Sequence, residues 1–140
     1  MSEENQEIEQ LLSAHDIKPT AIRTLVARAL ACAGRPESLG ELENQLQSVD
    51  KSGIARALAL FRTHQLVHII EDGSDAVRYE LCHSHHSNYD DDAHAHFYCT
   101  QCHKTYCLEE TTPPNIDLPS GFVAETVNFV IKGICPNCHQ

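Results

Sequence analysis

Two pairs of cysteines constrain this 140-residue chain more than any other feature. Cys99 and Cys102 form one C-x-x-C sequence, Cys135 and Cys138 form another, and 32 residues separate the two pairs. A C-x-x-C turn directs two sulfurs toward a common centre, and two such turns supply the four thiolates of a closed, tetrahedral zinc site. Closed coordination is typical of a structural ion. The spacing therefore predicts a structural zinc that ties together two distant segments.

Two other uses of paired cysteines compete with zinc. A thioredoxin-like redox pair would need a C-x-x-C that opens a helix in a βαβ setting, whereas these pairs stand near the ends of β-prone runs. An iron–sulfur cluster is the second alternative. Zinc is favoured because it would also supply the folding energy that a small C-terminal domain lacks.

The cysteine count and the N-terminal residues indicate the compartment. Seven cysteines cannot all be paired, and thiols stay reduced in the cytoplasm. The first residues, "MSEENQEIEQ", do not resemble a secretory signal, and no run approaches the about 18 apolar residues of a membrane span. We expect a cytoplasmic protein without a membrane segment.

The N-terminal half has the periodicity of a helical core. Apolar residues recur at helical spacing in 18–34, where Pro19 suits the first turn and Gly34 the end. A second helix is expected from the N-cap Ser38 to Leu46, and a third after the N-cap Asp50. Residues 3–14 predict an additional acidic helix. Cys32 is interpreted as a small buried side chain.

The runs at 66–70 and 77–81 are β-prone and flank a turn, which predicts a hairpin after the helices. Three helices followed by a hairpin are typical of a winged helix-turn-helix domain, whose third helix can enter the major groove of DNA. The net charge of −10 argues against nonspecific nucleic-acid binding, but residues 18–62 carry seven basic side chains against four acidic ones. A local basic face is therefore expected.

The polar, histidine-rich and acidic segment 83–93 predicts a hinge between two domains. The expected organisation is a DNA-binding domain at 1–82 and a smaller dimerisation and metal-binding domain at 94–140. The second domain is predicted to be mostly β, with strands at 95–100 and 104–109 and a long strand-like run at 122–135. The fold class is α+β.

A second group of metal donors surrounds this hinge. His94 and His96 form an H-x-H sequence that presents two imidazoles to one face of a strand, and Cys82 and Cys107 end β-prone runs on either side of the hinge. A mixed nitrogen and sulfur site drawn from both domains would change their relative angle when filled.

The chain resembles the ferric uptake regulator family of metal-responsive, dimeric repressors. The resemblance spans about residues 17–138 and is carried by the H-x-H ahead of a C-x-x-C at 94–102, by "GICPNC" at 133–138 and by the helix in 50–67. It implies a winged helix, a C-terminal α/β dimerisation domain, a structural four-cysteine zinc in many members and a regulatory metal at the hinge. Metal then closes the homodimer onto an operator in double-stranded DNA.

The zinc uptake regulators are the nearest match within this family, and they imply the regulatory ligands. These are His68, Cys82, one or both of His94 and His96, and Cys107 where the family usually has an acid. Thiolate favours zinc over ferrous iron at such a site.

The third expected helix is the one that would contact DNA, and basic residues lie in and around it. Ala55 replaces the family's usual tyrosine, and Gly53 lowers the helix propensity of this segment. The residues that we expect to contact bases or phosphates are Lys51, Ser52 and Arg56, together with Arg23 and Arg62.

Other functions remain open from the sequence. The scaffold could respond to iron, or to haem held by histidine and cysteine beside Phe97, Tyr98 and Tyr106, with the Cys135–Pro136 dipeptide as a further haem signal. It could also buffer metal without binding DNA. An enzyme of thiol or zinc hydrolytic chemistry is not expected, because the sequence offers no set of residues with an open zinc position and a nearby general base.

Overall fold

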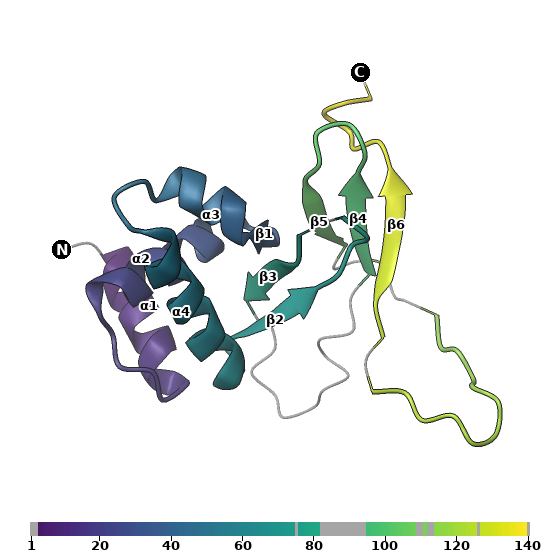
Figure 1. Ribbon diagram of the computed structural model, residues 1–140, viewed down its shortest axis with the longest axis horizontal. Coiled ribbons are helices and arrows are strands. Elements are labelled where there is room, and N and C mark those ends of the chain that lie inside the picture. Colours follow the sequence, from purple (N-terminus) through teal and green to yellow (C-terminus); the bar gives the residue numbers. More distant parts are fainter. Residues whose placement is uncertain are drawn as a thin grey trace. The chain divides into compact units, whose positions relative to one another are not determined.

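The computed structural model describes residues 3–74, 76–81, 95–108, 111, 114–125 and 127–139. The chain divides into two compact units, Met1–Cys82 and His83–Gln140, each with its own sheet (Figure 1). The predicted hinge at 83–93, with Cys82 and His94 beside it, lies outside the described residues. No helix in the described part of the chain is long and apolar enough to cross a bilayer.

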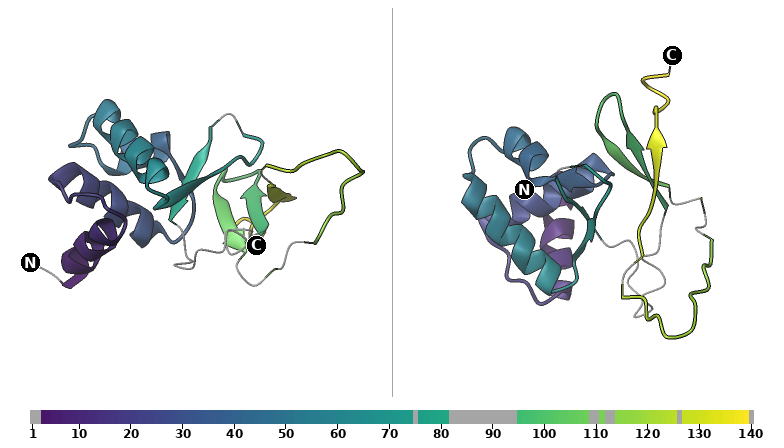
Figure 2. Two further views of the ribbon diagram at one scale, coloured as in Figure 1. Left: turned by 90° about the horizontal axis from the view of Figure 1, so that it is seen from below. Right: turned by 45° about the vertical axis from the view of Figure 1, so that its right-hand side comes forward.

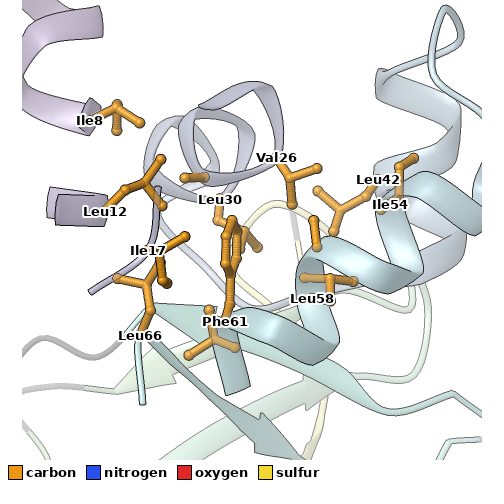
Figure 3. Packing of buried hydrophobic residues seen from close by; sticks show 13 residues of the cluster. Ile8, Leu12, Ile17, Val26, Leu30, Leu42, Ile54, Leu58, Phe61 and Leu66 are labelled. Atoms are coloured by element: carbon orange, nitrogen blue, oxygen red, sulfur yellow. The ribbon is translucent and has the colours of Figure 1, made fainter. Parts of the chain in front are cut away.

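The N-terminal unit contains the four helices that the periodicity predicted. They are α1 (Glu3–Ala14), α2 (Ala21–Ala33), α3 (Leu39–Gln45) and α4 (Lys51–Thr63). Apolar side chains from all four helices form one core, in which Leu12, Phe61 and Leu42 are completely buried (Figure 3). The four helices lie close together in the ribbon views of Figures 1 and 2.

Polar caps set where these helices begin. Thr20, and not the turn around Pro19, caps α2 by accepting a hydrogen bond from the Arg23 amide at 3.2 Å, so this helix starts later than expected. The predicted cap Ser38 forms a capping box with Glu41, and Asp50 accepts a hydrogen bond from the Gly53 amide at 3.0 Å. The caps predicted for α3 and α4 are confirmed.

Cys32 is not buried, contrary to the sequence interpretation. Its sulfur is exposed and donates to a carboxylate oxygen of Glu4 at 3.2 Å, which raises the pKa of the thiol. The physical reason is the helical period, because Cys32 lies two positions after the buried Leu30 and therefore faces away from the core.

A three-stranded sheet completes the N-terminal unit. Strands β2 (Val67–Ile70) and β3 (Arg78–Leu81) form the predicted antiparallel hairpin. A two-residue strand, β1 (Glu37–Ser38), pairs with the other edge of β3 and was not predicted. The register places His68 directly opposite Glu80.

The C-terminal unit contains a second three-stranded sheet in the order β5-β4-β6. Its strands are β4 (Ala95–Cys99), β5 (Thr105–Leu108) and β6 (Phe129–Gly133). Strands β4 and β5 form the predicted antiparallel pair, and β6 runs parallel to β4.

The long strand expected from residue 122 was wrong in its length. Phe122, which is 67% exposed, lies outside the sheet, and the strand begins only at Phe129. The partner strand β4 explains why β6 is short. The two strands pair residue for residue, from Phe129 opposite Ala95 to Gly133 opposite Cys99. Beyond these five pairs the apolar residues that the structure describes between 122 and 128 have no strand partner in its described part, so their β propensity does not produce a strand there.

Candidate functional site

The four cysteines of the two C-x-x-C sequences come together at one end of the C-terminal sheet. Cys99 ends β4, Cys102 follows in the next turn, and Cys135 and Cys138 lie just after β6. Their four sulfurs lie within 4.8 Å of one another. We call these four residues the cysteine cluster.

The spacing of the sulfurs fits a tetrahedral ion. Zinc–sulfur bonds of about 2.3 Å place the corners of a tetrahedron about 3.8 Å apart. The sulfurs of Cys102 and Cys135 are separated by 3.8 Å, well beyond the about 2.05 Å of a disulfide bond. All four are free thiols. The cysteine cluster could therefore hold a divalent metal ion with closed coordination.

Backbone hydrogen bonds shape the cysteine cluster. The amides of Cys102 and Cys135 both donate to the sulfur of Cys99 at 3.4 Å. The amide of Thr100 donates to the carbonyl of Gly133 at 2.8 Å, which attaches the first C-x-x-C turn to the end of β6. His103, with φ of 63°, closes that turn by donating its amide to the carbonyl of Cys99. Both turns thus direct sulfurs to the same point.

These contacts shift the pKa values of the cluster thiols in different directions. The amide of Cys102 is the main cause that lowers the pKa of Cys99 to about 6, and the phenol of Tyr106 lowers the pKa of Cys135. Hydrogen bonding with Cys135 raises the pKa of Cys138 to about 12, with the neighbouring sulfurs adding to the effect. The cluster thus favours thiolates at Cys99 and Cys135 but disfavours ionisation of Cys138, a balance that a bound dication would change.

The C-terminal sheet separates this cluster from a second pair of donors. Residues that pair across strands point to the same face, and successive residues point to opposite faces. Cys99 and Phe97 therefore share one face of β4 with Tyr106, which pairs with Phe97. His96 pairs with Cys107 on the other face.

His96 and Cys107 form this second donor pair. His96 is only 4% exposed and Cys107 is half-buried. One imidazole and one thiol at opposing strand positions can contribute two ligands to one ion. The structure thus brings together two of the predicted regulatory residues, whereas His94 and Cys82 lie outside its described part.

His68 meets a partner in the N-terminal unit that the sequence interpretation missed. The Nε2 atom of His68 lies 3.0 Å from a carboxylate oxygen of Glu80, which is 3% exposed. A buried carboxylate beside a histidine can ligate a metal or orient the imidazole. The sequence could have indicated this pair, because a hairpin whose two strands pair across residues 71–77 places residues 68 and 80 opposite each other.

The predicted DNA-contacting residues lie on α2 and α4. Lys51, Ser52, Arg56 and Arg62 are exposed on α4, and the half-buried Arg23 donates to the carbonyl of Lys18 at 2.9 Å. Arg23 and Arg56 line one open groove between the two helices. Neither helix contains an acidic residue, whereas α1 and α3 are acidic. Positive charge is therefore concentrated on two of the four helices.

The structure gives a reason for Gly53 in α4. A β-carbon at this position would lie 2.8 Å from the cap oxygen of Asp50 and 3.5 Å from the side chain of Ile22. Gly53 thus allows the capped end of α4 to approach α2 closely, which offsets its poor helix propensity.

The three aromatic residues considered for haem do not share a face. Phe97 and Tyr106 lie on the face of the cysteine cluster, whereas Tyr98 pairs with Thr105 on the opposite face and hydrogen-bonds His103 at 2.9 Å. They do not form one aromatic pocket.

Comparisons with known proteins identify the architecture. The sequence is matched by no family model and by no curated protein. Among solved structures, a zinc uptake regulator complexed with zinc and DNA superposes with a TM-score of 0.67 at 17% identity, covering 99% of this chain and 97% of the other. The chain has the fold of the ferric uptake regulators.

Two further structures have the same ferric uptake regulator fold. Holo XcZur is 23% identical with a TM-score of 0.61 and covers 96% of both chains. The Vibrio cholerae ferric uptake regulator is 16% identical with a TM-score of 0.63, covering 91% of this chain and 98% of the other. The predicted mixed α and β architecture is confirmed, and metal-binding and DNA-binding regulators share it.

Proposed function

We propose that this protein is a cytoplasmic, homodimeric repressor that binds operator DNA through an N-terminal winged helix in response to a metal, with zinc preferred over iron. It carries out no catalysis. The observation that carries the proposal is the pair of metal-donor sets on opposite faces of the C-terminal sheet, one of four thiols and one of imidazole and thiol. The first set is suited to a permanent ion and the second to an exchangeable one.

In this proposal the cysteine cluster holds a structural zinc ion. Four thiolates match the preference of zinc for soft, tetrahedral coordination. A bound ion would supply four bonds between the β4–β5 turn and the end of β6. The residues around the cluster already hold these segments together through the contact of Thr100 with Gly133.

The regulatory ion is assigned to His68, Cys82, one or both of His94 and His96, and Cys107, with Glu80 added as a ligand or an orienting partner. Support comes from the two local pairs, His68 with Glu80 and His96 with Cys107. Two thiolates in this set favour zinc over ferrous iron. Because the ligands come from both units of the sequence, occupancy would select one arrangement of these units, and a coupling free energy of about 1–3 kcal/mol is sufficient for a switch.

The distribution of charge supports DNA binding through α4. Helices α2 and α4 carry five basic residues and no acidic ones, in a chain whose net charge is −10. Clustered Lys and Arg side chains attract phosphates, while the acidic remainder of the chain limits nonspecific binding. We assign base or phosphate contacts to Lys51, Ser52 and Arg56, and phosphate contacts to Arg23 and Arg62.

Exposed apolar side chains support a homodimer. Among the described residues of the C-terminal unit, seven large apolar side chains are between 47% and 88% exposed, and most of them lie outside its sheet. Such a concentration is typical of a protein–protein interface. These residues are Ile116, Leu118, Phe122, Val123, Val127, Ile131 and Ile134.

Metal analysis of three variants tests the division into two sites. Cys82→Ser is expected to leave a folded dimer that has lost one zinc ion per chain and no longer binds DNA in a metal-dependent way. Cys99→Ser is expected to unfold or monomerise the C-terminal unit. Cys32→Ser is the matched control, because Cys32 is an exposed thiol of α2 and should change neither property.

DNA binding is measured by selecting bound sequences from a random duplex library with and without zinc. Enrichment of a palindromic sequence only with zinc supports the repressor. Uptake of the second ion without any DNA enrichment would instead identify a metal buffer. Equal loss of fold in Cys82→Ser and Cys99→Ser would contradict the two-site division.

A further inference from the structure

Ser52 lies in the first turn of α4, the helix to which we assign contacts with bases. Its side chain is exposed, and so is that of Arg56, which lies one turn further along the same helix face. Ala55 is also within one turn of Ser52, but its methyl group is too small to cover the hydroxyl. The first residues of a recognition helix are the ones that contact base edges in the major groove. The Ser52 hydroxyl is therefore open to DNA that approaches this end of α4.

The hydrogen bonds of this turn determine what the Ser52 hydroxyl offers to a partner. It donates its single proton to Oδ2 of Asp50 at 3.0 Å, while Oδ1 of Asp50 accepts the amide of Gly53 at 3.0 Å. An ionised carboxylate only accepts hydrogen bonds, so the direction of the first bond is fixed. The bond from Ser52, followed by that from Gly53, lowers the pKa of Asp50, and the carboxylate stays ionised at neutral pH. Ser52 thus keeps lone pairs for a partner, and its proton is committed.

An edge that consists only of acceptors distinguishes the four bases in the major groove. Adenine and cytosine each present an exocyclic amino group there, N6 and N4, which donates hydrogen bonds. Guanine presents the acceptors N7 and O6, and thymine presents the acceptor O4 beside a methyl group. A serine usually contacts either kind of base, because a hydroxyl both donates and accepts. A serine whose proton is committed pairs with an amino group only.

We propose that Ser52 is a specificity-determining residue of α4 and accepts a hydrogen bond from the exocyclic amino group of an adenine or a cytosine, because Asp50 holds its proton. This inference rests on the proposed DNA binding. Guanine or thymine at the same position would place one oxygen acceptor against another, next to the exposed carboxylate of Asp50. The preference expected from one such hydrogen bond is about 5-fold in affinity.

Replacement of Asp50 by asparagine is expected to reverse this preference. Asparagine caps helices as well as aspartate does, so its Oδ1 atom would keep the bond from the Gly53 amide. Its Nδ2 atom would then take the place of Oδ2 and donate to the Ser52 oxygen. The hydroxyl proton would become free to donate to a base. Asp50→Asn should therefore prefer guanine or thymine where the wild type prefers adenine or cytosine.

The test uses the full-length, zinc-loaded protein and the duplex that it enriches from a random library. Binding is measured to duplexes that differ from this sequence by one base pair at a time. The wild type is expected to prefer adenine or cytosine on one strand by about 5-fold at one position of each half-site. Ser52→Ala should lose this preference, and Ser52→Thr should keep it because it retains the hydroxyl. Asp50→Asn also removes a negative charge and should raise affinity for all duplexes alike, so the preference at that position is compared and not the total affinity.

Thr63→Val is the matched control on the same helix. The Thr63 hydroxyl also donates within α4, to the carbonyl oxygen of Ala59 at 3.0 Å, but it lies in the last turn. Its removal should leave every base preference unchanged.

Two results would overturn the role of Ser52 and leave the proposed function standing. The first is a Ser52→Ala protein that keeps all base preferences of the wild type. The second is an Asp50→Asn protein that still prefers adenine or cytosine while its circular dichroism shows intact helices, a criterion that does not depend on the folding of Ser52→Ala. A wild type that enriches no sequence with zinc would overturn the proposed DNA binding itself, and with it this inference.

Discussion

Replacement of Arg78 is expected to destabilise the N-terminal unit more than replacement of any other arginine that forms an ion pair there. Its side chain is 6% exposed, and its Nε atom donates to Asp72 at 2.7 Å, where the carboxylate side chain is fully buried. Its Nη1 atom contacts Glu41, the residue that closes the capping box of α3. Arg78 thus joins β3 to both the hairpin turn and the start of α3.

The size of the expected loss in unfolding free energy follows from the buried Asp72 charge that Arg78→Met would leave behind. Removing one partner of a buried ion pair costs about 3–5 kcal/mol, because the remaining charge loses its compensation. Glu41 is 27% exposed and can be solvated, so Asp72 accounts for most of this loss. A domain of this kind has a total unfolding free energy of about 5–15 kcal/mol, so the loss is a large fraction of it.

Two other arginines provide graded controls. Arg28 and Glu4 are 45% and 50% exposed with 3.7 Å between their charged atoms, so Arg28→Met should change the unfolding free energy by about 0–1 kcal/mol. Arg35 pairs at 3.2 Å with the buried Glu37, which also accepts a hydrogen bond from Gln45 at 2.6 Å. Arg35→Met should therefore lower the unfolding free energy by more than Arg28→Met and by less than Arg78→Met.

The assay is urea unfolding followed by circular dichroism at a helical wavelength, because the four described helices all belong to the N-terminal unit. The double variant Arg78→Met with Asp72→Leu should recover part of the lost stability, since both buried charges of this ion pair are then removed. The reasoning is refuted if Arg78→Met unfolds at the same urea concentration as Arg28→Met, or if the double variant is less stable than Arg78→Met alone.

Three further outcomes are expected. Phe61→Ala should lower the unfolding free energy by about 3–5 kcal/mol in the same urea assay, because its fully buried ring would leave a cavity in the core. Gly53→Ala should give no net gain in thermal stability, although alanine improves helix propensity by about 1 kcal/mol, because its β-carbon would lie 2.8 Å from the cap oxygen of Asp50. Removal of metal by a chelator should abolish protection of β4 amides in hydrogen exchange while those of α2 stay protected, and equal loss in both would show that the cluster does not act locally.

The helical unit could be predicted from the sequence because two independent signals agreed. Apolar residues recur with the helical period, and Ser38 and Asp50 mark two helix starts with side chains that satisfy free amides. The strand β1 could not be found in this way. Two residues cannot show a period of two, and Glu37 is an unusual strand residue whose buried carboxylate contacts Arg35 and Gln45.

The metal donors show the same contrast between local and tertiary information. The cysteine cluster was predictable, since each C-x-x-C turn is a local signal for paired sulfurs. Glu80 and Tyr106 were not, because an acid or a tyrosine in a β-prone run carries no mark of its partner. Their positions follow from strand register, which places Glu80 opposite His68 and Tyr106 on the face of Cys99.

Strand register also explains how one hairpin can serve two sites. Tyr106 and Cys107 are neighbours in sequence, yet period-two alternation places the first on the face of Cys99 and the second on the face of His96. A slip of one residue between β4 and β5 would turn Cys107 to the face of the cysteine cluster and separate it from His96. The turn between the strands contains Cys102 and is anchored to β6 through Thr100, so a structural ion at the cluster would fix this register. We therefore expect the dependence to run in one direction: loss of the cluster at Cys99 should remove both metal sites, whereas loss of Cys107 should remove only the exchangeable one.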